Sequence, residues 1–282
     1  MILVIDVSNV CYMSMYSLRG LSTKDIETGV IFGFLNLLLT WSEKFQTNEI
    51  VFAVDSRKSK RKRLYPEYKE NRSEQPPDIL DLIKAMHIQR EIILSEVLPA
   101  MGFSNIFMQA GYEADDVIAS ITQNFDEDFT VISSDNDLHQ LLDYCTIYSP
   151  QTKATLTRDW YLRTHGLEPK SWIDIKAISG CTSDNIKGVP GFGELTARKY
   201  LLGFLKENSK AYSNLMSDDG QETYKRNLEL VSLPMDGFKP IEDLPYDNLN
   251  IDGFMEVCHK YDFRSFINTT KFDKWKRFFN HK

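Results

Sequence analysis

Carboxylates follow apolar runs at several points in this sequence. Asp6 ends the run from Ile2, and Asp55 ends the run from Ile50. Further acidic residues stand downstream: Glu113, Asp115 and Asp116, then Asp135 and Asp137, and finally Asp184. Hard divalent cations such as Mg²⁺ take oxygen ligands, for which Asp and Glu are the natural source. If they meet, these side chains fit two Mg²⁺ or Mn²⁺ ions about 4 Å apart, an arrangement that hydrolyses phosphodiesters without a covalent enzyme intermediate.

Taken singly, each acid has a simpler interpretation, because Asp often ends strands, starts turns and caps helices. Glu113 and Asp116 lie at an expected helix start, where acidic groups favourably meet the helix dipole. On a helix these two share a face and Asp115 points elsewhere, so we expect Glu113 and Asp115 nearer one ion and Asp116 nearer the second. Asp135 and Asp137 project to the same side of extended backbone and can bracket one cation.

A basic run follows Asp55, although the whole chain has a formal net charge of −7 and a pI near 5.4. Six of the seven residues from Arg57 to Arg63 are cationic, and Lys69 and Arg72 extend the run. Such a run is ordinarily a solvated loop or a subcellular localisation signal. Its place after Asp55 and before two tyrosines favours contact with a phosphate backbone and stacking on bases.

The composition limits the class of protein. A chain of 282 residues can bury the core of one large or two modest domains. Its cysteines, Cys11, Cys145, Cys181 and Cys258, show neither a disulfide framework nor zinc-finger spacing. The N-terminus lacks the features of a signal peptide, and no apolar run approaches the roughly 20 residues of a membrane span. We therefore expect a soluble protein of the cytoplasm.

The elements that must position the acids are predicted from periodicity. Residues 1–6, 50–54 and 129–132 are apolar runs typical of buried strands. Residues 28–44 and 78–97 carry apolar side chains at helical spacing, and a further helix is expected to begin near Tyr112. This alternation predicts a βαβ architecture with a mainly parallel sheet. Because ligands bind beyond the carboxyl ends of such strands, Asp6, Asp55 and Asp135 are expected in one pocket.

The second half of the chain is predicted to be helical and loop-rich, with a boundary between Pro150 and Lys170. The segment from Gly188 to Gly193 contains three glycines and a proline. It is either an ordinary interhelical turn or a loop whose backbone approaches a phosphate, with the amides of the helix from Glu194 facing that phosphate. Residues 254–282 are aromatic and basic and are expected to form a helical cap.

Five ordered motifs resemble the structure-specific 5′ nuclease family, which includes phage flap endonucleases and 5′→3′ exonucleases and the 5′-nuclease domain of bacterial DNA polymerase I. They are Val4-Ile5-Asp6, Tyr65-Pro66-Glu67-Tyr68-Lys69-Glu70-Asn71-Arg72, Glu113-Ala114-Asp115-Asp116, Ser134-Asp135-Asn136-Asp137 with Gln140-Leu141-Leu142, and Ser183-Asp184-Asn185-Ile186-Lys187-Gly188-Val189-Pro190-Gly191-Phe192-Gly193. The short length and the absence of a polymerase module look like the phage or stand-alone form.

The resemblance implies an α/β fold with a PIN-like catalytic domain over residues 1–165, crossed by a helical arch around residues 58–90. It implies a helical DNA-binding subdomain over residues 166–282. Within that subdomain, a helix-two-turn-helix (H3TH) element near residues 175–204 would grip duplex backbone, and the carbonyls of the Gly188–Gly193 loop would hold K⁺. The C-terminal cap completes this part of the chain.

The resemblance also implies roles for residues. Asp6, Asp55, Glu113 and Asp115 look like the group that binds a first metal ion, and Asp135, Asp137 and Asp184 like the group that binds a second. Lys69 and Arg72 match cations that contact the scissile phosphate, and Tyr68 is placed to stack on a base. The expected DNA contacts are Arg57, Lys58, Lys60, Arg61, Arg63, Tyr68, Lys187, Gly188, Gly191, Gly193 and Lys199.

One position departs from the family pattern. Family members usually carry an Asp three residues before the position of Asp184, and here Cys181 stands there. A neutral thiol is a poor ligand for Mg²⁺, whereas a thiolate favours a softer ion. The other interpretation is that Cys181 is a small packed residue and that Asp135, Asp137 and Asp184 suffice.

The expected function is that of a Mg²⁺- or Mn²⁺-dependent, monomeric nuclease acting at 5′ ends or single-strand/duplex junctions of DNA, including RNA-primed ends. Its setting would be phage-type replication or repair, in the host cytoplasm if phage-encoded. Two alternatives are a catalytically weakened protein that binds DNA junctions and an RNA-cleaving PIN-type nuclease. A P-loop and a nucleophile elbow are both absent from the sequence.

Overall fold

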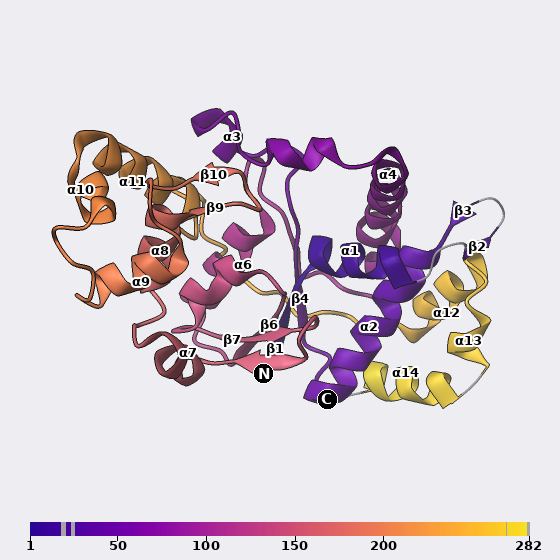
Figure 1. Cartoon of the computed structure of the whole chain (residues 1–282). Helices are drawn as coiled ribbons and strands as arrows, with labels where there is room; N and C mark the ends of the chain where they lie inside the picture. Colours follow the sequence, from indigo (N-terminus) through magenta and orange to yellow (C-terminus); the bar gives the residue numbers. More distant parts are fainter. Residues whose placement is uncertain (18–20, 24–25, 269, 281–282) are drawn as a thin grey trace.

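The computed structural model describes residues 1–17, 21–23, 26–268 and 270–280, so three residues of the expected cap, 269, 281 and 282, lie outside the described residues. A six-stranded sheet with the order β5–β4–β1–β6–β7–β8 forms the centre (Figure 1). Neighbouring strands are parallel except β7 and β8, which are antiparallel. The strands are β1 Ile2–Asp6, β4 Ile50–Ala53, β5 Ile106–Phe107, β6 Phe129–Ile132, β7 Thr146–Ser149 and β8 Ala154–Leu156.

The sheet is buried on both faces. Leu3 and Ile5 of β1 belong to one hydrophobic cluster and Val4 belongs to another, because successive side chains of a strand point to opposite faces. Helices α1 (Val7–Ser17) and α2 (Gly29–Phe45) contribute to the first cluster, and α6 (Ala114–Asn124) contributes to the second. Strands covered on both sides must be apolar at successive positions, which explains their continuous Ile, Leu and Val runs.

The segment expected as an arch, residues 58–90, joins the two sides of the molecule and is called here the bridging segment. It contains α3 (Arg61–Leu64), the 3-10 helix η1 (Glu70–Glu74) and most of α4 (Pro77–Ile92), and it runs along the upper edge of Figure 1. Helix α4 packs on α1 and α2. The predicted helix over residues 78–97 continues beyond α4 as the π-helical turn η2 (Ile93–Val97) and α5 (Leu98–Ala100).

The H3TH element expected near residues 175–204 is present as two helices joined by a hairpin and a glycine-rich loop. Helix α8 (Ser171–Ser179) leads into the strands β9 (Gly180–Cys181) and β10 (Ile186–Lys187), and α9 (Glu194–Leu201) follows the loop. Gly180 has a φ of +76°, and a Cβ built on Gly188 would lie 2.2 Å from the carbonyl oxygen of Ser179. The backbones approach too closely there for a side chain.

The remaining helices flank these parts. Helix α11 (Asp218–Val231) packs on α8, and the others on this side are α7 (Arg158–His165) and α10 (Lys210–Met216). The C-terminal cap consists of α12 (Ile251–Lys260), α13 (Arg264–Ile267) and α14 (Thr270–Asn280). These helices share the hydrophobic cluster of α2 and lie across the sheet from α8–α11 (Figure 1). The domain boundary at residue 166 stays a prediction, and the cap packs on the first part of the chain.

Several elements were not expected from the sequence: α1, the last two strands of the central sheet (β7 and β8), the 3-10 helix η3 (Asn136–Leu141), and the hairpin of β2 (Ser22–Thr23) and β3 (Ile26–Glu27). Strands β7 and β8 are four and three residues long, which is too short for a clear period. None of the helices in the described part of the chain is long and apolar enough to span a membrane.

Candidate metal centre and nucleic-acid interface

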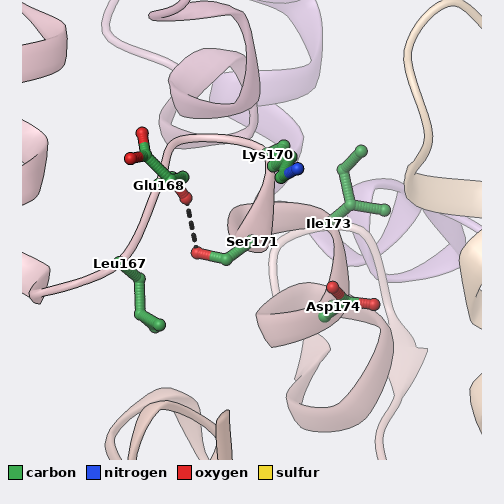
Figure 2. Close-up of a pocket in the computed structure, with 6 residues that line it drawn as sticks. All are labelled: Leu167, Glu168, Lys170, Ser171, Ile173 and Asp174. Atoms are coloured by element: carbon green, nitrogen blue, oxygen red, sulfur yellow. Dashed lines mark hydrogen bonds between the residues drawn. The ribbon is translucent and has the colours of Figure 1, made fainter. Parts of the chain in front are cut away.

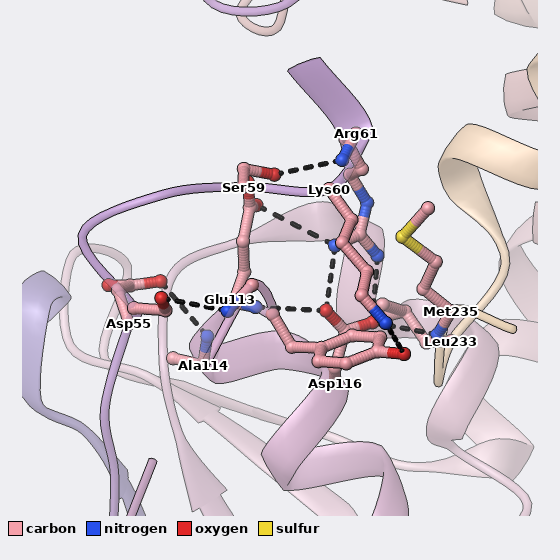
Figure 3. A network of polar contacts seen from close by, with 12 residues as sticks. Asp55, Ser59, Lys60, Arg61, Glu113, Ala114, Asp116, Leu233 and Met235 are labelled. Carbon is pink, nitrogen blue, oxygen red and sulfur yellow. Dashed lines mark hydrogen bonds and ion pairs between the residues drawn. The ribbon is translucent and has the colours of Figure 1, made fainter. Parts of the chain in front are cut away.

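Two of the predicted carboxylates, Asp6 and Asp55, lie at the carboxyl edge of the sheet. Asp6 is the last residue of β1, and its Oδ2 accepts a hydrogen bond of 3.3 Å from the hydroxyl of Ser133, which follows β6. Asp55 follows β4, and its Oδ1 accepts a 2.9 Å bond from the backbone N–H of Ala114 at the start of α6 (Figure 3). The parallel strands thus bring Asp6, Asp55 and the N-terminus of α6 together, as the sequence predicts.

The electrostatics of this group are those of crowded like charges. Burial, together with the charges of Asp55 and Asp135, raises the pKa of Asp6 to about 7. Burial, Asp135 and Asp6 raise the pKa of Asp115 well above its ordinary value. Four carboxylates form no ion pair with any residue that the structure describes: Asp6, Asp55, Asp115 and Asp135. A bound cation would relieve their mutual repulsion, so this donor set fits a divalent ion.

Glu113, the residue before α6, differs because cations already surround it. Its Oε2 accepts bonds from the Tyr68 hydroxyl (2.9 Å) and the Lys69 ammonium (2.7 Å). Burial alone would raise the pKa of Glu113, but the charges of Lys69 and Arg61 outweigh it and lower this pKa to about 2. Glu113 is therefore ionised at neutral pH.

Lys69 and Arg72, the expected phosphate contacts, lie against the acids. Arg72 forms a 3.0 Å ion pair with Oδ1 of Asp184, and Lys69 Nζ lies 3.8 Å from the same oxygen. Lys69 has a φ of +54°, and its backbone N–H donates to the Asp184 carbonyl at 2.9 Å. The bridging segment is thus bound both to Glu113 and to the loop after β9.

A second acidic group lies between η3 and the β9–β10 hairpin. Ligand atoms of Asp137, Cys181 and Asp184 all lie within 4.8 Å of one another, so the three could hold a metal ion. Burial and the charge of Asp135 raise the pKa of Asp137 to about 6, although the neighbouring Lys176 opposes this. Two of the three acids expected at a second ion, Asp137 and Asp184, therefore lie close together, and the charge of Asp135 acts on the pKa of both.

Asp116 does not take part in these groups, which corrects its expected role as a metal ligand. It is fully buried, and its two oxygens accept bonds of 2.7 and 2.8 Å from the guanidinium of Arg61 (Figure 3). It also accepts from the backbone N–H groups of Glu113 (2.9 Å) and Met235 (2.8 Å). With these four hydrogen bonds, Asp116 caps α6 and ties three segments together.

Two expected DNA contacts are corrected for the same reason, which is burial. The Arg61 side chain is 3% exposed and also donates from Nε to the carbonyl of Leu230, at 2.8 Å. Tyr68 is 2% exposed, and its hydroxyl contacts Glu113 and Asp184 rather than leaving a ring face open to a base. Lys60 is half-buried, and its ammonium lies over the Tyr112 ring, 4.0 Å from the centroid.

Other members of the basic run are at the surface. Arg57, Lys58 and Arg63 are exposed. Lys187 is exposed and forms a 2.7 Å ion pair with Glu67. In the H3TH element, Gly191, Gly193 and Lys199 are exposed and Gly188 is half-buried. Their roles as DNA contacts stay predictions.

Three polar residues of the site were missed by sequence reasoning. Lys176 of α8 is buried, and its ammonium lies 3.3 Å from Asp137 and 3.1 Å from Glu194. A lysine within the apolar stretch Ile175–Ile178 was the signal that could have revealed it. Ser133 and Ser59, which bond to Asp6 and Glu113, offered no signal because isolated serines are common in loops.

A separate hollow of about 450 Å³ lies at the start of α8 (Figure 2). None of the carboxylates described above lines it. Its lining residues are Leu167, Glu168, Lys170, Ser171, Ile173 and Asp174.

The mainly parallel sheet, the acidic groups at its carboxyl edge and the H3TH element place the chain in the class of PIN-like folds. A model of the 5′–3′ exonuclease N-terminal, resolvase-like domain matches residues 1–166. The chain belongs to the 5′–3′ exonuclease family.

Relatives and solved structures agree with this assignment. The thermostable DNA polymerase I of Thermus caldophilus is 30% identical over 256 residues, which cover 87% of this chain and 29% of the polymerase. DNA polymerase I of Streptococcus pneumoniae is 28% identical over 288 residues, which cover 93% of this chain and 32% of the polymerase. The chain thus spans about a third of the length of the curated relatives it matches.

Two solved structures share the fold. The flap endonuclease of bacteriophage T5, solved with DNA and metal ions, has a TM-score of 0.69 at 23% identity, over 83% of this chain and 89% of that one. The catalytic core of Rad2 in complex with DNA has a TM-score of 0.54 at 18% identity, over 91% of this chain and 85% of that one.

Proposed function

We propose that the chain hydrolyses phosphodiester bonds of DNA at 5′ ends or single-strand/duplex junctions, using two divalent ions, Mg²⁺ or Mn²⁺. One observation carries this proposal. Carboxylates without an ion pair to a described protein cation gather at the carboxyl edge of the sheet, and two cationic side chains, Lys69 and Arg72, pair with the nearby acids Glu113 and Asp184. An acidic pocket that can hold ions next to donors that can hold phosphate is what metal-dependent hydrolysis requires.

Asp6, Asp55, Glu113 and Asp115 would hold the first ion, and Asp135, Asp137 and Asp184 the second. Bound ions supply a nucleophilic water at neutral pH and neutralise charge on the phosphate. Asp6 is held in place by bonds from the Asn9 backbone (3.0 Å) and Ser133, so its carboxylate is oriented before any ligand arrives. Tyr68 orients both Glu113 and Asp184 through its hydroxyl.

Lys69 and Arg72 would exchange partners when substrate binds. In the structure they neutralise Glu113 and Asp184, and ions bound to these acids would release both side chains toward the phosphate. Arg72 is 61% exposed, so it can turn outward without loss of packing. Charge-assisted bonds from two such donors would stabilise the phosphate as negative charge develops on it.

The H3TH element would bind the duplex next to the cleaved strand. The exposed loop glycines, Gly191 and Gly193, allow close backbone approach, and Lys199 is exposed on the helix that follows. We also propose K⁺ at the carbonyls of this loop, activity on RNA-primed ends, a monomeric state, action in the cytoplasm and a part in phage-type replication or repair. The DNA complexes of the T5 and Rad2 proteins support a DNA substrate.

The test is cleavage of a labelled 5′-flap duplex by the full chain with Mg²⁺ or Mn²⁺. We expect 5′-phosphorylated products that disappear in EDTA and in the Asp135→Asn/Asp137→Asn variant. Asp126→Asn is the matched control, since Asp126 is an exposed acid just before β6. Absence of cleavage with either ion, or undiminished cleavage by the double variant, would refute the proposal.

Two alternatives are separated by the same assay. Tight flap binding without turnover at saturating Mn²⁺ would indicate a junction-binding protein, which the replacement of an expected acid by Cys181 favours. Faster cleavage of a single RNA strand than of the DNA flap would indicate an RNA-cleaving enzyme.

A further inference from the structure

The group formed by Asp137, Cys181 and Asp184 offers a thiol as well as two carboxylates, whereas a Mg²⁺ site uses oxygen ligands alone. Cys181 is 4% exposed, and its Sγ lies 3.9 Å from Oδ2 of Asp137. The ligand atoms of all three residues lie within 4.8 Å of one another. Bonds from Zn²⁺ to carboxylate oxygen and thiolate sulfur are about 2.0–2.3 Å long, so small side-chain rotations bring the three to one ion.

The backbone holds the thiol in this position. Cys181 pairs with Ile186 across the β9–β10 hairpin, and Asp184 lies in the turn between these strands. The same hairpin requires glycine at 180, where a Cβ would lie 2.4 Å from the Ile186 carbonyl oxygen. The side chain also belongs to a small hydrophobic cluster with Ala177 and Ile186. Packing and orientation of the sulfur toward Asp137 are therefore compatible, and the two interpretations of Cys181 do not exclude each other.

Two protein cations, Lys176 and Arg72, pair with the acids of this group, but both pairs can be exchanged for a bound ion. Lys176 is paired with Asp137 at 3.3 Å but also with Glu194 at 3.1 Å, so it keeps a partner when Asp137 turns to an ion. Arg72, which pairs with Asp184, is largely exposed and can leave. Because the side chains of Asp137 and Asp184 are only 18% and 13% exposed, a bound ion would have to replace the charge that Lys176 and Arg72 supply to them.

We propose that Asp137, Cys181 and Asp184 form a mixed thiolate–carboxylate site that binds thiophilic divalent ions such as Zn²⁺ and Cd²⁺ in preference to Mg²⁺. Thiolate sulfur selects such ions, whereas Mg²⁺ demands oxygen ligands. When the ion binds, the sulfur forms a metal–sulfur bond and its proton passes to the buffer, with no change of oxidation state. The inference rests on the proposed function, because this site is the second of the two ion positions named there.

The experiment titrates the reduced, EDTA-treated full chain with Cd²⁺ in the absence of DNA, and follows the ultraviolet charge-transfer absorption of the cadmium–thiolate bond. We expect a band that saturates at one ion per chain and persists in a large excess of Mg²⁺. Cys181→Ser should lose the band. Cys181→Asp should lose it too and gain at least about tenfold in Mg²⁺ affinity, measured by calorimetry, because an oxygen ligand replaces sulfur.

Cys145→Ser is the matched control, since the Cys145 sulfur bonds to the Leu141 carbonyl, away from the acids, and this variant should keep the band. If Cys181→Ser fails to fold, ¹¹³Cd NMR of the unmodified chain reports sulfur ligation directly. A wild-type chain without the band or the sulfur signal, or a band retained in folded Cys181→Ser, would overturn the inference. Flap cleavage with Mg²⁺ is measured in parallel. Cleavage without a band refutes this inference alone, and a band without cleavage refutes the proposed function alone.

Discussion

At the scale of single residues, the acids of the site differ in what already balances their charge. Glu113 and Asp184 are paired with Lys69 and Arg72, whereas Asp6 has only hydrogen-bond donors and like charges around it. Lys69 and Arg61 lower the pKa of Glu113 to about 2, whereas burial raises the pKa of Asp184 despite Lys69 and Arg72. Burial and like charges raise the pKa of Asp6 to about 7, so metal binding and protonation compete at this position.

This competition predicts an unusual pH dependence for Asp6→Asn in EDTA. The pKa of Asp6 is raised from 3.8 to about 7 in the folded chain, so the folded state binds more protons than the unfolded state between these values. The contribution of Asp6 to stability is therefore present below about pH 4 and lost as pH rises through 7. Because Asn resembles the protonated acid at every pH, the free energy of unfolding of the variant should exceed that of the wild type by on the order of 4 kcal/mol at pH 8 and match it near pH 4.

Urea unfolding at several pH values measures this difference. Mn²⁺ should reverse the order at pH 8, because the ion stabilises only the wild-type site. Asp126→Asn serves as the control without a site. A difference between Asp6→Asn and wild type that does not change with pH would contradict the prediction.

The buried pair of Arg61 and Asp116 gives a second prediction at this scale. Arg61→Met would leave the Asp116 carboxylate buried without its cation, and this costs about 3–5 kcal/mol in the free energy of unfolding. The double variant Arg61→Met/Asp116→Leu should recover part of the loss, because it removes the stranded charge. Arg63→Met, at an exposed position in the same helix, should change stability by less than about 0.5 kcal/mol.

Chemical unfolding of the three variants decides the role of Arg61. If Arg61→Met keeps wild-type stability and instead weakens DNA binding, Arg61 is a nucleic-acid contact rather than a buried partner of Asp116.

At the scale of elements, the close approach of α8, the hairpin and the loop depends on glycine. A Cβ on Gly188 would lie 2.2 Å from the Ser179 carbonyl oxygen, whereas a Cβ on Gly193 would meet nothing within 4 Å. We expect Gly188→Ala to lose at least about 2 kcal/mol of stability, because backbone rather than a flexible side chain must move. Gly193→Ala should cost less than about 1 kcal/mol, and thermal melts of both variants measure the difference. Equal costs would mean that the loop can shift as a unit.

The same elements show where sequence reasoning succeeds and where it stops. Continuous apolar runs predicted β1, β4 and β6, because burial on both faces requires apolar side chains at successive positions of a strand, and the acids that follow β1 and β4 lie at the carboxyl edge of the sheet. The side chains that pair with acids of this region lie far from them along the chain. Arg61 lies 55 residues from Asp116, and its neighbours from Arg57 to Arg63 look equally solvated in the sequence. Only the folded chain shows that one cation of this run is buried.

At the scale of the whole molecule, the chain returns at its end to the layer where it began. Trp275 of α14 is fully buried and packs against Phe254 with tilted rings, whose centroids are 4.3 Å apart, in the hydrophobic cluster that also contains residues of α2. Trp275→Ala should therefore destabilise the layer that contains β1 and α2 by about 3–5 kcal/mol, although it lies far from these elements in sequence. Near-ultraviolet circular dichroism follows the unfolding of the aromatic residues from β1 to α2. If this signal is lost in the same unfolding transition as the C-terminal cap, the two parts form one cooperative unit. Separate transitions would contradict it.

The whole chain has a formal net charge of −7, yet its proposed substrate, DNA, is also negatively charged. Binding must come from local cations, and each phosphate contact that is removed should reduce the slope of log K against log salt by about 0.9. In the Asp135→Asn/Asp137→Asn background, which prevents cleavage, Arg63→Gln should lower the slope by this amount. Lys276→Gln should not, because Lys276 lies on α14 in the C-terminal cap, across the sheet from α8 and α9. Both slopes are measured by the fluorescence anisotropy of a labelled flap duplex at salt concentrations from about 50 to about 200 mM. An equal reduction in the two variants would show that binding reflects the overall charge rather than a defined face.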